Sequence, residues 1–275
     1  MNEVVVSVVM PTYNRASLLE RSIKSVIDQT FKDWELIIID DASTDQTPAV
    51  LDAWAKKDSR IRIIRNPKNN YPDISKNLNN GINEAKGKYI ARLDDDDVWI
   101  DKEKLEKQVD FLENNPDHVV IGSGVIVVND QGQELFRYFK KETDIDIRNF
   151  MYHANPFSHT TVLFRKDTAQ KISGYGQWAQ AEDWEFWLRL GKEGKMHNLP
   201  VYTTKFLLAG QNKTLKHQRA QARTILQYLW FHRKAYPRFW SGYLLNTLQY
   251  AYSFLPLFFR KRMNSFLVSI KRKNF

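Results

Sequence analysis

Cysteine is absent from the 275-residue sequence. This absence excludes disulfides, zinc sites with thiolate ligands and cysteine nucleophiles, and it fits a reducing compartment. Asp and Glu are absent after Glu193, whereas residues 194–275 contain fifteen Lys and Arg. Because the whole chain carries a formal charge of +9, the first 193 residues carry −6. An acidic body followed by a basic, aromatic tail suggests contact with an anionic surface, either a membrane or a nucleic acid.

Several sequence signals are also missing. The N-terminus, Met1-Asn2-Glu3, lacks the basic start of a signal peptide. No G-x-G-x-x-G pattern and no Walker lysine pattern follows the first strand-like run, so a dinucleotide dehydrogenase or a P-loop NTPase is not expected. The uncharged run 239–259 is long enough to span a bilayer, but its Asn, Gln, Thr, Ser and Pro residues favour an amphipathic pair of helices lying on a surface.

Apolar runs alternate with helix-like spacing through most of the chain. Buried strands are expected at 4–10, 35–39, 61–65, 89–93, 119–128 and 161–165. Helices are expected at 18–29, 47–57, 78–85, 105–112 and 182–190, and a hairpin turn at 129–132. This alternation predicts an α/β fold in which a mostly parallel, Rossmann-like sheet is flanked by helices. From about residue 214, helical segments broken by Pro237 and Pro256 predict a helical C-terminal extension.

Three polar clusters follow three of the expected strands, at residues 11–15, 40–45 and 94–97. Because ligands bind at the carboxyl ends of parallel strands, we expect these clusters to meet at one sheet edge. Four adjacent aspartates repel one another, and a divalent cation with a phosphate-bearing ligand would neutralise them. The alternatives are a solvated acidic turn at 94–97 and an Asx-capped turn at 40–41. For Glu182-Asp183 the alternative is charge that complements a helix dipole.

Four segments read VSVVMPTYNR (6–15), ELIIIDDASTD (35–45), GKYIARLDDDD (87–97) and AEDWEFW (181–187). In this order they resemble the signature segments of glycosyltransferase family 2, and the chain is similar to members that build bacterial surface polysaccharides. The resemblance covers roughly residues 4–215. It implies inverting enzymes of the GT-A fold, with a catalytic domain at 1–213 divided into a nucleotide-sugar half (about 1–100) and an acceptor half (about 101–213). Residues 214–275 would form a basic, aromatic, helical extension.

The resemblance also implies residue roles. Asp183 would be the catalytic base, and Asp96, with Asp94, would bind Mn²⁺ or Mg²⁺. Asp41 would accept a hydrogen bond from the uracil ring, with Asp40 beside it. The other nucleotide-sugar contacts would be Pro11, Thr12, Tyr13, Arg15, Asn79, Arg92, Asp94 and Asp95. The contacts to the acceptor or the diphosphate would come from His159, Glu182, Trp184 and Gln211, and a purely structural histidine is the alternative for His159.

One position departs from the family pattern. Many members carry a histidine near the metal or diphosphate just after the catalytic core, and Ala209 occupies that place here. The resemblance therefore leaves the third protein ligand open. Gln211 would substitute for the histidine, or the ion would be held by Asp96, the diphosphate and water.

The sequence thus predicts metal-assisted single displacement of a sugar from a UDP-sugar to a glycan or lipid-linked acceptor. A metal ion would neutralise the leaving diphosphate, and a carboxylate would take the proton of the attacking hydroxyl. The basic extension predicts a cytoplasmic enzyme, peripheral on the inner face of the cell membrane through anionic lipid. Packing of the aromatic residues of 214–275 on the catalytic domain or on a second subunit, as a homo-oligomer, is the alternative.

Two other function classes stay open. A nucleic-acid-binding module would use the basic residues and aromatic rings of the extension. It leaves the three polar clusters and their acidic residues unexplained, so nucleic acid is not the expected partner. A nucleotidyltransferase with a GT-A-like fold would carry a glycine- and lysine-rich loop after the first strand, and residues 12–17 lack it.

Overall fold

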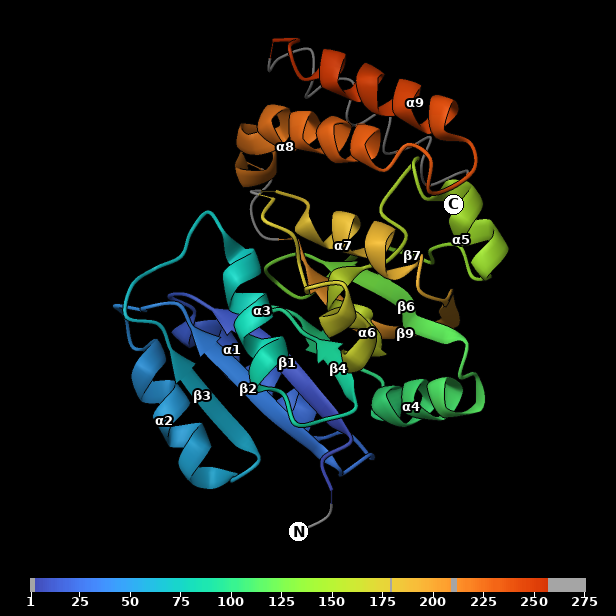
Figure 1. Cartoon of the computed structure of the whole chain (residues 1–275). Helices are drawn as coiled ribbons and strands as arrows, with labels where there is room; N and C mark the ends of the chain where they lie inside the picture. The colour runs from blue at the N-terminus through green and yellow to red at the C-terminus, as the bar shows by residue number, and fades with distance from the viewer. Residues whose placement is uncertain (1–2, 179, 209–211, 257–275) are drawn as a thin grey trace.

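The computed structural model describes residues 3–178, 180–208 and 212–256 (Figure 1). Ala209 and Gln211, the positions considered for a third metal ligand, lie outside the described residues. One sheet carries the strand order β3-β2-β1-β4-β8-β6-β9-β5, and β7 pairs with β6. In the described part of the chain, no helix combines the length and the hydropathy needed to cross a membrane.

The strands are β1 (Val6–Thr12), β2 (Trp34–Asp40), β3 (Ile61–Arg65), β4 (Tyr89–Arg92), β5 (Val98–Trp99), β6 (His118–Val128), β7 (Glu134–Tyr138), β8 (Leu163–Arg165) and β9 (Lys195–Leu207). The helices are α1 (Ala16–Ile27), α2 (Thr47–Lys57), α3 (Ile74–Glu84), α4 (Lys104–Asn114), α5 (Asp144–Phe150), α6 (Lys166–Lys171), α7 (Glu182–Leu190), α8 (Asn212–Phe231) and α9 (Phe239–Tyr252), with one 3-10 turn at His159–Thr161.

The first four strands form the parallel sheet that the sequence predicts. β1 lies between β2 and β4 and pairs in parallel with both, and β2 pairs in parallel with β3. Alternate side chains of β1 and β2 point to opposite faces. Val9 and Ile37 pack with α3, whereas Val8 and Ile38 pack with α1 and α2. Both faces are therefore covered, which explains the nearly continuous apolar runs of these strands.

The first strand has the expected length but lies two residues further along the chain than the expected range 4–10. It begins at Val6 and continues through Pro11 and Thr12. Its pairing with β4 ends at Val9, so beyond that residue β1 has a neighbouring strand on the β2 side alone. A proline lacks a backbone N–H and is tolerated where one edge of the strand has no ladder to complete. The expectation that the strand ends at residue 10, before Pro11, is therefore wrong.

Beyond β4 the sheet becomes mixed. β8 pairs antiparallel with β4 and β6, β6 pairs in parallel with β9, and β5 pairs antiparallel with β9. β9, which the sequence did not predict, alternates irregularly between buried and exposed residues and contains Pro200. The helix expected at 78–85 begins earlier, at Ile74, and ends at Glu84.

Helices α8 and α9 form an antiparallel hairpin that lies over α7 (Figure 1). The break near Pro237 is confirmed, because α8 ends at Phe231 and α9 begins at Phe239. Tyr228, Leu229 and Phe239 are buried in the same apolar cluster as the α7 residues Phe186 and Trp187. The hairpin is thus an extension of the main core.

Candidate active site

The four aspartates form a loop between β4 and β5, which we call the acid loop (residues 94–97). Its first residue is held by a buried cation. Arg92, which is 1% exposed, donates from Nη2 to Asp94 Oδ1 at 2.5 Å and from Nη1 to the carbonyl oxygens of Val9 and Leu93. The guanidinium therefore fixes the position of the Asp94 carboxylate relative to the ends of β1 and β4.

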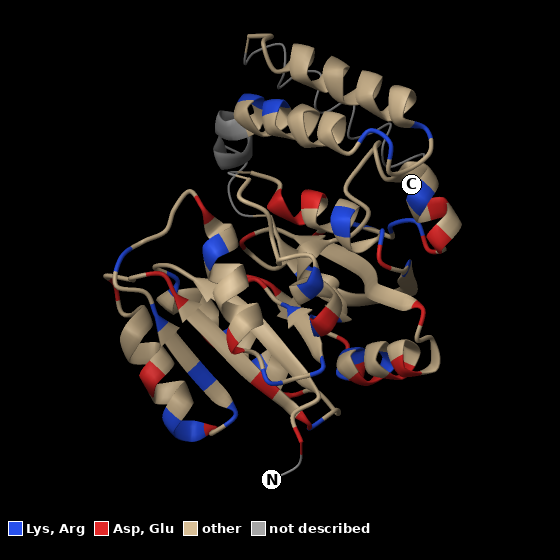
Figure 2. Cartoon of the chain, in the orientation of Figure 1, with Lys and Arg blue, Asp and Glu red and all other residues tan. Residues whose placement is uncertain are grey.

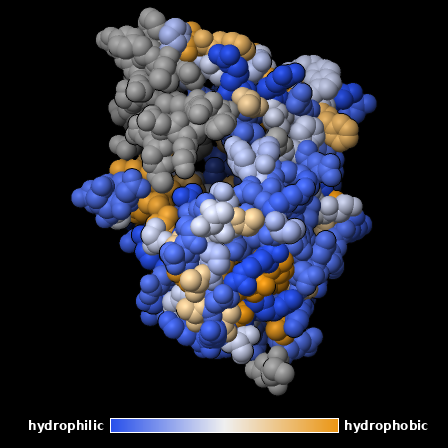
Figure 3. Space-filling view, turned by 90° about the vertical axis from the view of Figure 1, so that its left-hand side faces the viewer, coloured by the Kyte–Doolittle hydropathy of each residue, from blue (hydrophilic) through white to orange (hydrophobic). Residues whose placement is uncertain are grey.

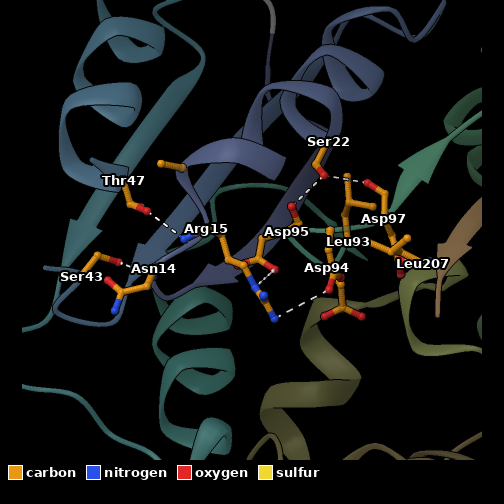
Figure 4. A network of polar contacts seen from close by, with 12 residues as sticks. Asn14, Arg15, Ser22, Ser43, Thr47, Leu93, Asp94, Asp95, Asp97 and Leu207 are labelled. Atoms are coloured by element: carbon orange, nitrogen blue, oxygen red, sulfur yellow. Dashed lines mark hydrogen bonds and ion pairs between the residues drawn. The ribbon is translucent and has the colours of Figure 1, made fainter. Parts of the chain in front are cut away.

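A second cation reaches the acid loop from the start of α1 (Figure 4). Arg15 Nε lies 3.7 Å from Asp95 Oδ1, and Arg15 Nη2 lies 3.8 Å from Asp96 Oδ2. Ser22 Oγ is within donating distance of the carbonyl oxygens of Asp95 (2.9 Å) and Asp97 (2.7 Å). The acid loop is therefore tied to α1 by both charge and hydrogen bonds.

The acid loop gathers several buried or half-buried carboxylates. Burial raises the pKa of Asp95 to about 7, and burial together with the charge of Asp94 raises the pKa of Asp96. Asp97 accepts a 2.9 Å bond from the Leu207 N–H at Oδ1, while its buried Oδ2 has no hydrogen-bond partner. Crowded carboxylate oxygens of this kind are the ligands that hard cations prefer. Among the described residues, however, no cluster of three or more His, Asp or Glu side chains could hold a metal.

The loops after β1 and β2 lock together beside the acid loop. Asn14 and Ala42 both have positive φ angles, 52° and 62°, which turn the chain sharply after each strand. Asn14 Oδ1 accepts from the Thr44 N–H at 2.8 Å, and the Arg15 N–H donates to Thr47 Oγ1 at 2.9 Å. Thr12 is buried, whereas Tyr13 is 44% exposed. The predicted polar clusters at 11–15, 40–45 and 94–97 thus meet at one sheet edge.

Asp40 and Asp41 have different partners. Asp40 Oδ1 accepts from the Ser43 N–H at 3.0 Å, a local hydrogen bond that closes the turn after β2. Asp41 accepts from Asn66 Nδ2 at 2.8 Å and from the Asn70 N–H at 3.0 Å. The second aspartate therefore anchors the polar segment that precedes α3, a contact that the sequence did not predict.

Asp183 lies in the first turn of α7, after Ala181, whose positive φ of 55° starts the helix abruptly. Asp183 Oδ2 accepts from Asn155 Nδ2 at 2.6 Å, and Oδ1 accepts from the Trp184 N–H at 2.8 Å. Burial raises the pKa of Asp183, and burial with the neighbouring Asp183 charge raises the pKa of Glu182 to about 7. A carboxylate with a raised pKa is a stronger base at neutral pH.

Asp94 and Asp183 line the same pocket, whose volume is about 240 Å³. The acid loop and the start of α7 therefore face one space, although they are distant in the sequence. The other residues that line it are Tyr138, Lys140, Asn155, Phe157, Ser158, His159, Thr160 and Phe206.

His159 lies in this pocket wall and is held neutral. Its Nε2 is 2.8 Å from the Tyr175 hydroxyl. Burial, followed by the charge of Arg92, lowers the pKa of His159 to about 3. A neutral imidazole in this place can donate or accept a hydrogen bond but does not supply positive charge.

Two predicted site residues make structural contacts. Asn79 donates from Nδ2 to the Tyr175 carbonyl at 2.9 Å and accepts from the Tyr175 N–H at 2.7 Å, so it joins α3 to the segment before α7. Trp184 is 5% exposed and donates from Nε1 to the Met151 carbonyl at 2.8 Å. Its described contacts lie in the core rather than in the pocket.

Sequence reasoning missed the pocket residues Tyr138, Lys140, Asn155, Thr160 and Phe206. They come from β7, β9, the 3-10 turn and irregular segments, and none belongs to the four signature segments. The NPFSHT stretch at 155–160 was the nearest signal, because it places polar residues just before a strand.

The family whose model matches residues 7–173 is described as "Glycosyl transferase family 2". The protein named "Putative glycosyltransferase EpsE" of Bacillus subtilis (strain 168) is 37% identical over 193 residues, which cover 69% of this chain and 67% of EpsE. The amylovoran biosynthesis glycosyltransferase AmsE of Erwinia amylovora is 30% identical over 198 residues, covering 70% of this chain and 73% of its own.

Solved structures share the fold at low sequence identity. S. aureus TarS (1–349) in complex with UDP matches with a TM-score of 0.63 and 20% identity, covering 82% of this chain and 65% of that chain. The mannosyltransferase PcManGT from Pyrobaculum calidifontis, in complex with GDP-Man and Mn²⁺, matches with a TM-score of 0.68 and 18% identity, covering 90% of this chain and 72% of that chain.

Proposed function

Because the chain belongs to glycosyltransferase family 2, we propose that it transfers a sugar from a UDP-sugar to a glycan or lipid-linked acceptor with inversion of the anomeric centre. The observation that carries the proposal is the shared pocket, in which Asp94 and Asp183 face one space. Asp94 lies on the proposed donor side, and Asp183 has the environment of a base. This arrangement fits a single displacement, for which one base is enough.

The proposed step uses the acceptor hydroxyl as nucleophile. Its oxygen forms a bond to the anomeric carbon while the bond from that carbon to the diphosphate oxygen breaks. Asp183 takes the hydroxyl proton, and the nucleoside diphosphate leaves with the electron pair. The hydrogen bond from Asn155 holds the Asp183 carboxylate in place during attack. Attack opposite to the leaving group inverts the anomeric centre.

We propose that Asp94 and Asp96 hold Mn²⁺ or Mg²⁺ together with the donor diphosphate. The bound ion would neutralise charge on the leaving group. The crowded carboxylates and the orphaned Oδ2 of Asp97 support the assignment, and the fold neighbour PcManGT is described with Mn²⁺. Because two aspartates are too few to fill a coordination sphere, phosphate and water oxygens would supply the rest.

UDP is the proposed nucleotide because Asp41 matches the residue that contacts uracil in the family, and the fold neighbour TarS is described with UDP. The uracil-binding site around Asp41 would also be lined by Asp40, Pro11, Thr12 and Tyr13. The contacts of Asp41 with Asn66 and Asn70 imply that uracil binding and the position of this segment depend on each other.

On the acceptor side, the name of AmsE supports a polysaccharide acceptor. His159 and Glu182 would contact the acceptor or the diphosphate. The proposed place of action is the inner face of the cell membrane, where lipid-linked acceptors are met. The hairpin is the proposed means of attachment, and a homo-oligomer through the same hairpin is the alternative.

A panel of UDP-sugars and GDP-sugars tests this function. We expect one UDP-sugar to raise the melting temperature in the presence of Mn²⁺ or Mg²⁺ and to be hydrolysed slowly to UDP. Release of pyrophosphate would instead identify a nucleotidyltransferase. A salt-sensitive shift with single-stranded RNA that UDP leaves unchanged would favour the nucleic-acid-binding alternative.

A further inference from the structure

The outer side of the α8–α9 hairpin exposes large apolar side chains. Trp240, Leu244 and Leu248 of α9 are 71%, 60% and 58% exposed, and we call them the α9 stripe. Their four-residue spacing places them one above the other on one side of the helix. Trp230 of α8, 45% exposed, lies 6.3 Å from Trp240 between ring centroids and widens the stripe across the hairpin.

The rotation of α9 is fixed by its inner side, so the stripe cannot turn inward. Phe239, Gly242 and Asn246 are buried against the main body. A Cβ atom on Gly242 would lie 2.5 Å from Tyr152 Cβ, so the helix approaches as closely as a glycine allows. Asn246 Nδ2 donates to the Tyr152 carbonyl at 2.9 Å, which satisfies a buried polar group on this side.

Positive charge lies at one end of the stripe. Arg233, Lys234 and Arg238 are exposed in the connection between α8 and α9. Figure 2 shows blue segments in this connection and near the start of the described part of α8, and no red in either helix. In Figure 3, apolar and strongly hydrophilic side chains lie next to each other along the top of the molecule, where the hairpin is. An apolar stripe with cations beside it matches the interface of an anionic bilayer.

We propose that this face of the hairpin docks on a membrane that contains anionic lipid, an inference that rests on the attachment of the hairpin proposed above. The indole rings and leucines enter the interfacial layer, and the Arg and Lys side chains contact lipid phosphates. A neutral apolar partner would leave the cations unmatched, and an acidic soluble partner would leave the stripe uncovered. A bilayer with anionic headgroups satisfies both features at once.

Docking would also orient the pocket, because the hairpin is fixed to α7. His232 Nε2 lies 3.1 Å from Glu185 Oε1, and both side chains are almost fully buried. The Tyr236 hydroxyl donates to the Leu188 carbonyl at 3.0 Å. Since α7 carries Asp183 at its start, a docked hairpin holds the base at a constant height and angle to the lipid surface.

Vesicle flotation tests the proposal. The full chain is mixed with vesicles of phosphatidylcholine alone, or of phosphatidylcholine and phosphatidylglycerol in equal parts. We expect flotation with the anionic vesicles and little with the neutral ones, and weaker flotation at high salt. The triple variant Trp240→Ala, Leu244→Ser, Leu248→Ser should reduce the bound fraction at least tenfold. The pair Arg233→Gln, Lys234→Gln should weaken binding to the anionic vesicles.

The matched control is Ile145→Ser on α5, whose side chain is 72% exposed and lies outside the hairpin. It should float as well as the wild type. The triple variant should keep its melting temperature and its donor hydrolysis in solution, so failure of docking and failure of the proposed chemistry are separate results. Equal flotation of wild type and triple variant would overturn the proposal. So would a concentration-dependent dimer that the triple variant abolishes without any change in flotation.

Discussion

The proposed donor half, with β1 to β4, and the proposed acceptor half, with β6, β8, β9 and α7, gather their polar residues differently. Donor strands are all parallel, and the loops after β1 and β2 bind each other directly, as Asn14 binds the Thr44 N–H. In the acceptor half, Asp183 is held by Asn155 from an irregular segment. Parallel topology alone brings together the polar residues of the first half, whereas those of the second half meet only after irregular segments have packed.

The largest expected effect is a loss of sugar transfer, and UDP binding should distinguish a variant of the proposed acceptor half from one of the proposed donor half. Asp183→Asn removes the proposed base, and general-base catalysis contributes roughly 10²–10⁴-fold, so transfer should fall by about that factor. UDP binding in the presence of Mn²⁺ should change little, because Asp183 lies on the acceptor side. Asp96→Asn should also nearly abolish transfer, but it should weaken metal-dependent UDP binding. Calorimetry with UDP and a transfer assay check both variants.

Glu182→Gln is the control for this comparison, because it changes the neighbouring carboxylate without removing the assigned base. It should retain much more transfer than Asp183→Asn. Transfer by Asp183→Asn at nearly the wild-type rate would show that the base is another residue.

A smaller effect should appear in the pH dependence of the acceptor half. The hydrogen bond from Asn155 and the charge of Lys140 both lower the pKa of Asp183, against the raising effect of burial. Their loss therefore raises this pKa further, and a base must be deprotonated to act. In Asn155→Ala the acid limb of the kcat/KM profile should move to higher pH, and Lys140→Met should move it less in the same direction. An unchanged limb in both variants would contradict the assignment of Asp183.

The smallest effect concerns the junction between the halves. Asn79→Ala removes two hydrogen bonds to the backbone of Tyr175 and leaves a buried N–H and carbonyl unpaired. The free energy of unfolding should fall by about 1–3 kcal/mol. Asn80→Ala, one residue further along α3, is the matched control and should cost less. Urea denaturation measures both, and equal losses would mean that the Tyr175 contact contributes nothing.

The sequence predicts the donor half well, because long apolar runs mark β1, β2 and β4, and the polar clusters follow directly. It fails for β9, whose residues are buried irregularly because the strand pairs with β6 on one side and the short β5 on the other. It also fails for the acceptor side of the pocket. Tyr138 and Phe206 reach the pocket through strand pairings that no local pattern encodes.

Within the site, sequence identifies the residue types but not their partners. The aspartates at 94–97 are recognisable as a cluster, yet nothing local indicates that Arg15 contacts two of them. In the same way, the pair Asp40 and Asp41 reads as one motif, although one residue closes a turn and the other anchors a distant segment.

The two arginines at the acid loop, Arg15 and Arg92, have a consequence for the order in which ligands arrive. Four carboxylates and two guanidiniums leave the acid loop and its contacts with a formal charge of −2. A nucleoside diphosphate that arrived alone would add negative charge to a site that is already negative. One that arrives as a complex with a divalent cation changes the local charge far less. A divalent cation would bring this formal charge from −2 to zero, so electrostatics favour a cation that enters first or with the nucleotide over a nucleotide that enters alone.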